Sequence, residues 1–168
     1  MSNLSAEEFR AIKRLVDRLG IADLMYEYCS RCDLNDPDGI AACFTEDCLT
    51  DYGPGPGQPT RGRSVRRSEA ARDLSLFEAT SHLLSNVRIS FEDDDRAQVR
   101  SVVHAWHRPK DSDAAWNLHG QYHDVVVRTE AGWRIAERKL VVVSAEGFPA
   151  EWSFHRIDRL ASEEHSRG

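Results

Sequence analysis

The chain has 168 residues and a formal net charge of −6, which predicts a single acidic domain with one hydrophobic core. The negative charge argues against a nucleic-acid-binding protein, and the one short basic run, at residues 61–67, is interpreted as a solvated surface. No segment approaches the roughly 20 apolar residues of a membrane-spanning helix, and the first residues show no apolar signal region. We therefore expect a cytoplasmic protein that binds neither nucleic acid nor membrane.

Helices are predicted in the first half of the chain. Apolar residues recur with helical spacing over residues 5–33, and a Ser-x-x-Glu capping box marks the start of this stretch. Gly20 lies within it and is expected to break or bend it into two helices. A short helix that begins near Pro37 follows, then a loop rich in glycine and proline, and then another helix over residues 64–77.

Strands are predicted in the second half, in four segments at residues 81–92, 96–109, 116–129 and 133–146. The breaks between them contain turn-forming residues, so these strands should form an antiparallel meander. Helices followed by a long sheet indicate an α+β fold, in which the sheet curves around the helices to bury its apolar face. A single domain is expected over residues 1–160, with a disordered tail at residues 161–168.

The sequence contains candidate metal ligands, but their spacing does not favour a metal site. A zinc site prefers two tight cysteine pairs separated by a longer loop, whereas the second pair here is loose and close to the first. Among the histidines of the predicted sheet, no two lie on a common inward face beside a carboxylate. We therefore expect no metal and no disulfide, and interpret the cysteines as buried small side chains. They are Cys29, Cys32, Cys43 and Cys48.

Three segments carry a resemblance to a known family. They are "CDLNDPDGIAACFTEDC" at residues 32–48, "SHLLSN" at residues 81–86 and "GQYHDVVVRTEAGWRIAERKL" at residues 120–140. With the order of predicted elements, they resemble the SnoaL-like branch of the NTF2-like superfamily over most of the chain. The resemblance implies a cone in which N-terminal helices pack on a curved antiparallel sheet and enclose a pocket. It does not imply one reaction, because this superfamily contains several kinds of enzyme as well as non-enzymes.

Within the superfamily, the chain most resembles the group of scytalone dehydratase, hexachlorocyclohexane dehydrochlorinase and bile acid 7α-dehydratase. These proteins share an aspartate–histidine pair, which Asp33 and His82 match. The dehydratase pattern adds a tyrosine and a second histidine, matched by Tyr52 and His107. The dehydrochlorinase pattern has an arginine after a Gly-Val-Trp turn, matched by Arg138.

Other polar positions depart from these patterns. The tyrosine that precedes the aspartate in scytalone dehydratase is Cys32 here, and its asparagine on the long strand is Tyr122. The lysine of the dehydrochlorinase falls at Tyr28. The combination of polar residues at these positions therefore differs from that of both relatives, and the substrate of neither relative is inferred for this protein.

The residues themselves support acid–base chemistry at Asp33 and His82. An elimination needs a base on a C–H bond, and histidine is the usual base near neutral pH. A carboxylate bonded to the other ring nitrogen fixes the tautomer and stabilises the imidazolium. Strand alternation places Asn86 on the same face as His82. The alternative for Asp33 is a structural role, in which it caps the turn after the helix.

The next strand offers two histidines on opposite faces. His107 lies on the face with the smaller side chains, which should line the cavity, whereas His104 shares the other face with Val102 and Trp106. Alternation therefore favours His107 as the second catalytic histidine, although a bulge would reverse the choice. The apolar outer face predicts a homo-oligomer, with a trimer favoured by the resemblance and a dimer as the alternative.

The function expected from these observations is a cofactor-independent lyase or isomerase acting on a small hydrophobic cyclic molecule. His82 would be the base and Asp33 its orienting partner, with Tyr52 and His107 on the substrate oxygen. Tyr52 could instead pack under the glycine- and proline-rich loop. The alternative function is non-catalytic, either a ring-hydroxylating dioxygenase β subunit or a small-ligand-binding module. Substrate contacts are expected from Tyr28, Tyr122, Arg138 and Asn86, although Tyr122 could be a core aromatic residue and Arg138 an ion-pair partner.

Overall fold

The first helix, α1 (Ala6–Asp33), is continuous in the computed structural model, which describes residues 4–54 and 58–157. Its capping box is present, because the Ser5 hydroxyl accepts from the Glu8 amide at 3.2 Å and the Glu8 carboxylate accepts from the Ser5 amide at 2.8 Å. The expected break at Gly20 is wrong. A glycine costs only about 1 kcal/mol in a helix interior, and the packing of α1 against the sheet outweighs this.

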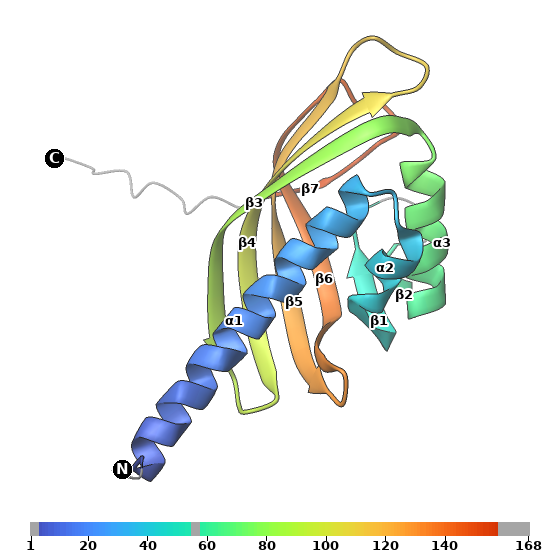
Figure 1. Cartoon of the computed structure of the whole chain (residues 1–168). Helices are drawn as coiled ribbons and strands as arrows, with labels where there is room; N and C mark the ends of the chain where they lie inside the picture. Colours follow the sequence, from blue (N-terminus) through green and yellow to red (C-terminus); the bar gives the residue numbers. More distant parts are fainter. Residues whose placement is uncertain (1–3, 55–57, 158–168) are drawn as a thin grey trace, which may run out of the picture.

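Two further helices follow at the C-terminal end of α1 (Figure 1). They are α2 (Pro37–Ala42) and α3 (Arg63–Leu74), and both confirm the prediction from the sequence. The Asp36 carboxylate accepts from the Gly39 amide at 2.8 Å and so caps α2. Asn35, with φ of 52°, takes the left-handed conformation in the turn between α1 and α2.

The sheet contains β1 (Phe44–Asp51), β2 (Thr60–Arg61), β3 (Phe77–Phe91), β4 (Arg96–Pro109), β5 (Trp116–Thr129), β6 (Gly132–Glu146) and β7 (His155–Arg156). Strands β3 to β6 form the expected antiparallel meander. Strands β1 and β7 both pair with β6 in parallel, so the sheet is mixed. The order β2-β1-β6-β5-β4-β3 places the two ends of the meander far apart. The α+β fold with a curved sheet is confirmed.

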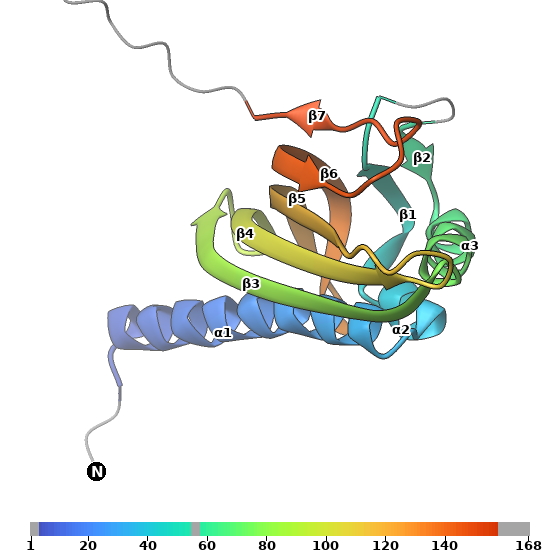
Figure 2. The same cartoon turned by 90° about the horizontal axis from the view of Figure 1, so that it is seen from above.

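The sheet curves, and α1 crosses it on the side of β3, while α2 and α3 lie at one end of the curve (Figure 2). Buried side chains from the second half of α1 pack against the inner faces of the strands, and Ile21, Met25 and Tyr28 are among them. The predicted tail at residues 161–168 lies outside the described residues. Among the described residues, no helix combines the length and hydropathy required to cross a membrane.

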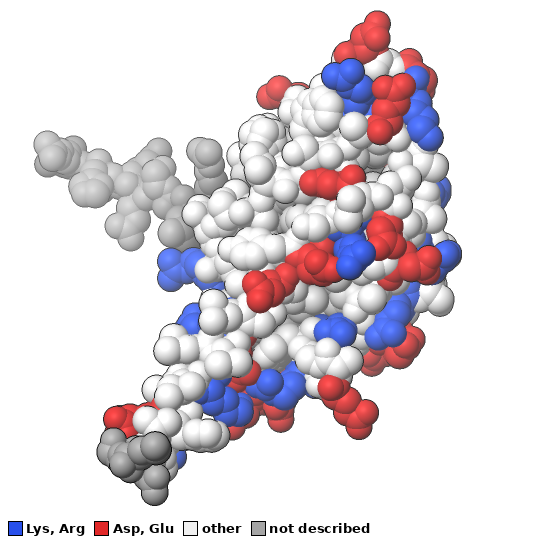
Figure 3. Space-filling model, in the orientation of Figure 1, with Lys and Arg blue, Asp and Glu red and all other residues white. Residues whose placement is uncertain are grey.

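The first half of α1 extends past the sheet and keeps its apolar side chains exposed. Phe9, Leu15 and Leu19 are 62%, 62% and 66% exposed. Uncharged side chains cover much of this part of α1 on the face drawn in Figure 3, where basic and acidic side chains are otherwise interspersed. The helical spacing of apolar residues therefore predicts the helix correctly, but not burial along its whole length.

Candidate active site

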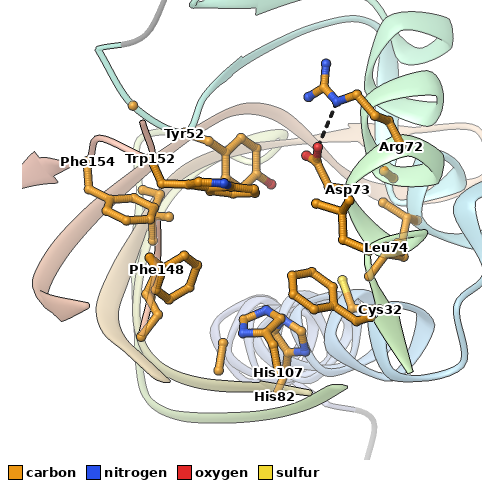
Figure 4. A pocket seen from close by; sticks show the side chains of 18 of the residues that line it. Cys32, Tyr52, Arg72, Asp73, Leu74, His82, His107, Phe148, Trp152 and Phe154 are labelled. Carbon is orange, nitrogen blue, oxygen red and sulfur yellow. Dashed lines mark hydrogen bonds and ion pairs between the residues drawn. The ribbon is translucent and has the colours of Figure 1, made fainter. Parts of the chain in front are cut away.

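A cavity of about 500 Å³ lies between the helices and the inner face of the sheet. Its walls come from all three helices, from strands β3 to β6 and from residues 148–154, which precede β7. Most of the lining is aromatic or aliphatic, with a few polar groups that converge from different elements (Figure 4). This composition and size are typical of a site for a small organic molecule.

Asp33 and His82 meet at the end of α1, as the sequence predicts. Asp33 Oδ1 lies 2.6 Å from His82 Nδ1, and Asp33 Oδ2 accepts from the backbone amide of His82 at 2.9 Å. The Thr80 hydroxyl donates to Oδ1 at 3.1 Å. All these bonds lead to β3, so the carboxylate of Asp33 does not cap the turn after α1. The carboxylate in that turn that acts as a helix cap is Asp36, at the start of α2. The predicted contact between the pair is confirmed.

The geometry fixes the tautomer of His82. Burial acts to raise the pKa of Asp33, but the hydrogen bonds from His82 and Thr80 outweigh it and lower the pKa below its ordinary value. The ionised carboxylate can only accept, so His82 Nδ1 carries a hydrogen, and in the neutral imidazole the lone pair is on Nε2. The His82 side chain is 8% exposed and lines the cavity. A buried imidazole with a free Nε2 is suited to accept a proton from a bound molecule.

His107 also lines the cavity, which confirms the strand alternation argued from the sequence. Its ring centroid lies 5.5 Å from that of His82, in an edge-to-face arrangement. Burial, reinforced by the nearby His82, lowers the pKa of His107 to about 4. His107 is therefore neutral near pH 7. His104 does not line the cavity and stacks on His119, with 4.1 Å between the ring centroids.

The lowered pKa of His107 predicts a pH-dependent stability. The unfolded chain binds this proton near pH 6.5, whereas the folded protein binds it only near pH 4, so the unfolded state holds more protons in between. Stability should therefore fall as the pH falls from about 6.5 to about 4, by up to about 3 kcal/mol. Urea unfolding at several pH values measures this slope. The variant His107→Gln should lose most of it, and an undiminished slope in that variant contradicts the assignment.

Three tyrosines form one wall of the cavity, namely Tyr28 on α1, Tyr52 directly after β1 and Tyr122 on β5. The hydroxyls of Tyr28 and Tyr52 lie 2.9 Å apart and share a hydrogen bond. Tyr28 also packs edge-to-face against Tyr122, with ring centroids 5.8 Å apart. Burial raises the pKa of Tyr28 and of Tyr122 well above the ordinary value, so both stay protonated near neutral pH. All three line the cavity, as expected for substrate contacts.

Two residues proposed from the sequence as substrate contacts lie elsewhere. Arg138 is completely buried between the rings of Tyr28 and Tyr122, each 4.0 Å from its guanidinium carbon, and is paired with Asp124 on β5. Asn86 is exposed, at a register shift between β3 and β4 and with φ of 52°. Neither residue lines the cavity. Arg138 therefore supports the tyrosine wall from behind, and Asn86 has left the face of His82 because the shift interrupts the alternation.

Arg66 lines the cavity, although the basic run that contains it is interpreted from the sequence as a solvated surface. For this residue the interpretation is wrong, since Arg66 is 7% exposed. Helical spacing gives the reason, because Arg66, Ala70 and Leu74 recur at four-residue intervals and form the buried face of α3. Its Nη1 donates to Glu69 at 3.2 Å. This spacing is the signal that could have identified Arg66 from the sequence.

The segment before β7 supplies a wall that the sequence does not predict. Phe148, Trp152 and Phe154 line the cavity and pack on one another, with ring centroids of Phe148 and Trp152 5.7 Å apart. The adjoining β7 is tied to β1, since His155 Nε2 lies 2.6 Å from Asp51 Oδ1. Figure 4 shows these aromatic side chains next to Tyr52 and across the cavity from Leu74.

Gly53 permits this segment to approach, so an alanine there should be destabilising. A Cβ at Gly53 would lie 2.3 Å from the backbone oxygen of Ser153, and backbone does not move aside easily. Overpacking of this kind costs about 1–3 kcal/mol. We expect Gly53→Ala to lower the free energy of unfolding by this amount, measured in urea. Gly20→Ala is the matched control, because its Cβ would make an ordinary 3.6 Å contact with Trp133 in a helix interior, and it should not destabilise.

Comparison with known proteins identifies the family. Residues 13–139 match the model of the SnoaL-like domain, which is well over half the chain. The structure of a candidate scytalone dehydratase from Novosphingobium aromaticivorans superposes with a TM-score of 0.83 and 31% identity, covering 90% of this chain and 99% of that one. The protein therefore belongs to the SnoaL-like family, as the resemblance in sequence suggests.

Two other structures show the range of this fold. A candidate aromatic ring hydroxylase from the same organism has a TM-score of 0.71 and 30% identity over 77% of this chain and 91% of that one. A hexachlorocyclohexane dehydrochlorinase of type 2 has a TM-score of 0.73 and 16% identity over 88% of this chain and 97% of that one, a likeness of fold alone. No curated protein matches the chain significantly in sequence. Among the described residues, no group of three or more histidine, cysteine or acidic side chains could hold a metal ion.

Proposed function

We propose that this protein is a cofactor-independent lyase of the dehydratase or dehydrohalogenase type, or an isomerase that uses the same proton abstraction. Its substrate is a small hydrophobic cyclic molecule. One observation carries the proposal, which is the 2.6 Å contact that orients His82 on Asp33 and leaves Nε2 free at an apolar cavity. Membership of the SnoaL-like family and the likeness to a candidate scytalone dehydratase support it.

The first step is removal of a proton from a substrate carbon by His82 Nε2. The C–H bond breaks and its electron pair forms a carbon–carbon double bond as the leaving group departs from the neighbouring carbon. Asp33 stabilises the imidazolium that forms, because its carboxylate already accepts from Nδ1. The apolar walls exclude water, which strengthens this electrostatic support.

The leaving group needs assistance of its own. A departing hydroxyl group must take up a proton to leave as water, and the Tyr52 hydroxyl or the His82 imidazolium can supply it. A departing chloride needs no proton. His107 is neutral near pH 7 and can bond the substrate oxygen without competing with His82 for the proton. An isomerase would instead return the proton from His82 to another carbon of the ring.

A screen of small cyclic compounds tests the proposal. Oxygenated and halogenated rings are first ranked by the shift they cause in the melting temperature. The ligands found are then incubated with the wild-type protein and with His82→Ala, and loss of water, loss of halide or movement of a double bond is followed by NMR. A chelator is expected to leave the rate unchanged. If no bound compound reacts in a His82-dependent manner, the lyase proposal fails.

The second candidate is a non-catalytic module, either a dioxygenase β subunit or a ligand-binding protein. The 30% identity to a candidate aromatic ring hydroxylase favours it. Such a module has no need of a base at His82. It would keep the cavity, and ligands would bind equally well to the wild-type protein and to His82→Ala without reaction. A β subunit would also need an α subunit for solubility, so purification of the chain alone in soluble form argues against it.

We also propose that the protein is a homo-oligomer, with no membrane or nucleic-acid partner. Apolar side chains occur on the outer face of the sheet, where Leu83 on β3 is 67% exposed near Val102 and Trp106 of β4, and Val143 on β6 is 49% exposed. A monomer would leave this face in water. Light scattering at micromolar concentration should give a multiple of 19.0 kDa, and Leu83→Glu should reduce it. A wild-type mass equal to that of one chain contradicts the prediction.

A further inference from the structure

Asp33 occupies an electrostatically unfavourable place in the fold. It is the last residue of α1, and the carbonyls of the last turn of a helix carry partial negative charge. A carboxylate is disfavoured at this end of a helix, yet the proposed mechanism needs Asp33 to be ionised so that it accepts from His82 Nδ1. The hydrogen bonds around the carboxylate therefore have to offset the effect of the helix.

The compensating donors come from one short stretch of β3. His82 supplies two of them, its backbone amide at 2.9 Å from Asp33 Oδ2 and its ring Nδ1 at 2.6 Å from Oδ1. The third is the hydroxyl of Thr80, 3.1 Å from Oδ1. Thr80 lies two residues before His82, so strand alternation turns both side chains to the same face of β3. Of these three donors, the Thr80 hydroxyl alone does not belong to the base itself.

The hydroxyl hydrogen of Thr80 has one favoured acceptor. A second oxygen lies within reach, the backbone carbonyl of Cys32 at 3.3 Å, but that carbonyl already accepts from the amide of Asn35 at 3.1 Å. The carboxylate oxygen is closer and charged, and charge-assisted hydrogen bonds are roughly twice as strong as neutral ones. The single hydrogen is therefore donated to Asp33.

Thr80 can act on the reaction without contacting the substrate. It does not line the cavity, in contrast to His82 and to His107, its direct partner across β3 and β4. The side chain of Thr80 branches at Cβ, which leaves few rotamers for its hydroxyl. A stiff donor outside the cavity is suited to holding the carboxylate in place.

We propose that Thr80 is a positioning residue for the proton abstraction, whose hydroxyl fixes the Asp33 carboxylate in the orientation that accepts from His82 Nδ1. The inference rests on the proposed function, because it concerns the same base. With Thr80 in place, Asp33 Oδ1 is held by donors on two different residues of β3. Without it, both remaining bonds to the carboxylate within the described ranges come from His82 itself.

The same bond influences where the proton stays after His82 has taken it from the substrate. Burial acts to raise the pKa of Asp33, and the bonds from His82 and then from Thr80 lower it. A carboxylate with fewer donors is more basic and competes better for the Nδ1 hydrogen of the imidazolium. The Thr80 bond therefore helps to keep this hydrogen on the ring and leaves Asp33 as the counter-charge.

Thr80→Val tests the inference, because valine keeps the branched shape and removes the hydroxyl. On a substrate found by the ligand screen it should lower kcat about 10-fold, as for one hydrogen bond to a charged group, and leave KM unchanged because residue 80 does not line the cavity. Thr80→Ser returns the hydroxyl and should recover most of the rate. Ser90→Ala, on an exposed residue of the same strand, is the control and should match the wild-type protein. If Thr80→Val does not fold, Thr80→Ala replaces it.

Two NMR measurements on the protein without substrate report on the pair directly. Titration of ¹³C-labelled aspartate carboxyl groups, with Asp33 assigned by Asp33→Asn, should give a higher pKa for Asp33 in Thr80→Val than in the wild-type protein. The ¹⁵N shifts of the His82 ring should show the Nδ1–H tautomer in the wild-type protein and a partial change to Nε2–H in Thr80→Val. Thr80→Ser should restore both signals.

These readouts keep the two proposals distinguishable. If the NMR changes occur but no compound reacts in a His82-dependent manner, the inference about positioning stands and the proposed reaction fails. If turnover depends on His82 but Thr80→Val keeps the wild-type kcat, the inference fails and the proposed reaction stands. Unchanged NMR signals in Thr80→Val, or a loss of rate that Thr80→Ser does not recover, also overturn the inference.

Discussion

Replacement of His82 by alanine is expected to lower turnover about 10²–10⁴-fold, the contribution of a positioned general base. Asp33→Asn should also be slow. The amide can present an N–H where the imidazole Nδ1–H needs an acceptor, and the 2.6 Å contact would then favour the wrong tautomer. The measurement is the steady-state rate on a substrate found by the ligand screen, with circular dichroism to verify the fold.

Ser90→Ala is the control for this pair of variants. Ser90 lies on the same strand, β3, as His82 but is exposed, so loss of its hydroxyl should leave the rate unchanged. If both His82→Ala and Asp33→Asn kept the wild-type rate, the Asp33–His82 pair would have a structural role and not a catalytic one. The non-catalytic module would then be the better account of the cavity.

The Asp33–His82 pair is predicted by the resemblance to the dehydratase and dehydrochlorinase patterns, whereas periodicity predicts only where each residue lies on its own element. Asp33 is the last residue of a helix whose apolar spacing can be counted, and His82 lies near the start of a strand with clear alternation. The same alternation places His107 on the inner face of β4, because β4 has no bulge at that point. Where the alternation is interrupted, as at Asn86, the prediction loses its basis.

The rest of the site depends on contacts between distant segments. The pairing of Arg138 with Asp124 is a cross-strand contact set by the register of β5 and β6, which the sequence of one strand does not reveal. The aromatic wall at Phe148 and Trp152 lies in an irregular segment with neither helical nor strand periodicity. Parallel pairing of β1 with β6 likewise joins segments from opposite halves of the chain.

Arg138→Met is expected to lower the free energy of unfolding by about 3–5 kcal/mol, as for other buried ion pairs that lose one partner. Both side chains of the pair are 0% exposed, and the guanidinium donates twice to Asp124, at 2.8 Å from Nε and from Nη2. The variant leaves the carboxylate of Asp124 without its counter-charge in the core. Equilibrium unfolding in urea measures the loss.

The double variant Arg138→Met, Asp124→Leu distinguishes the pair from simple packing. It removes both charges and fills the space with apolar atoms, so it should recover much of the stability that Arg138→Met loses. The rings of Tyr28 and Tyr122 would still lose their stacking on the guanidinium, which lies 4.0 Å from each. The affinity of the double variant for ligands of the cavity should therefore remain lower than that of the wild-type protein, even if its free energy of unfolding recovers. A double variant no more stable than Arg138→Met would show that packing against the two tyrosines, rather than the charge of Asp124, makes Arg138 indispensable.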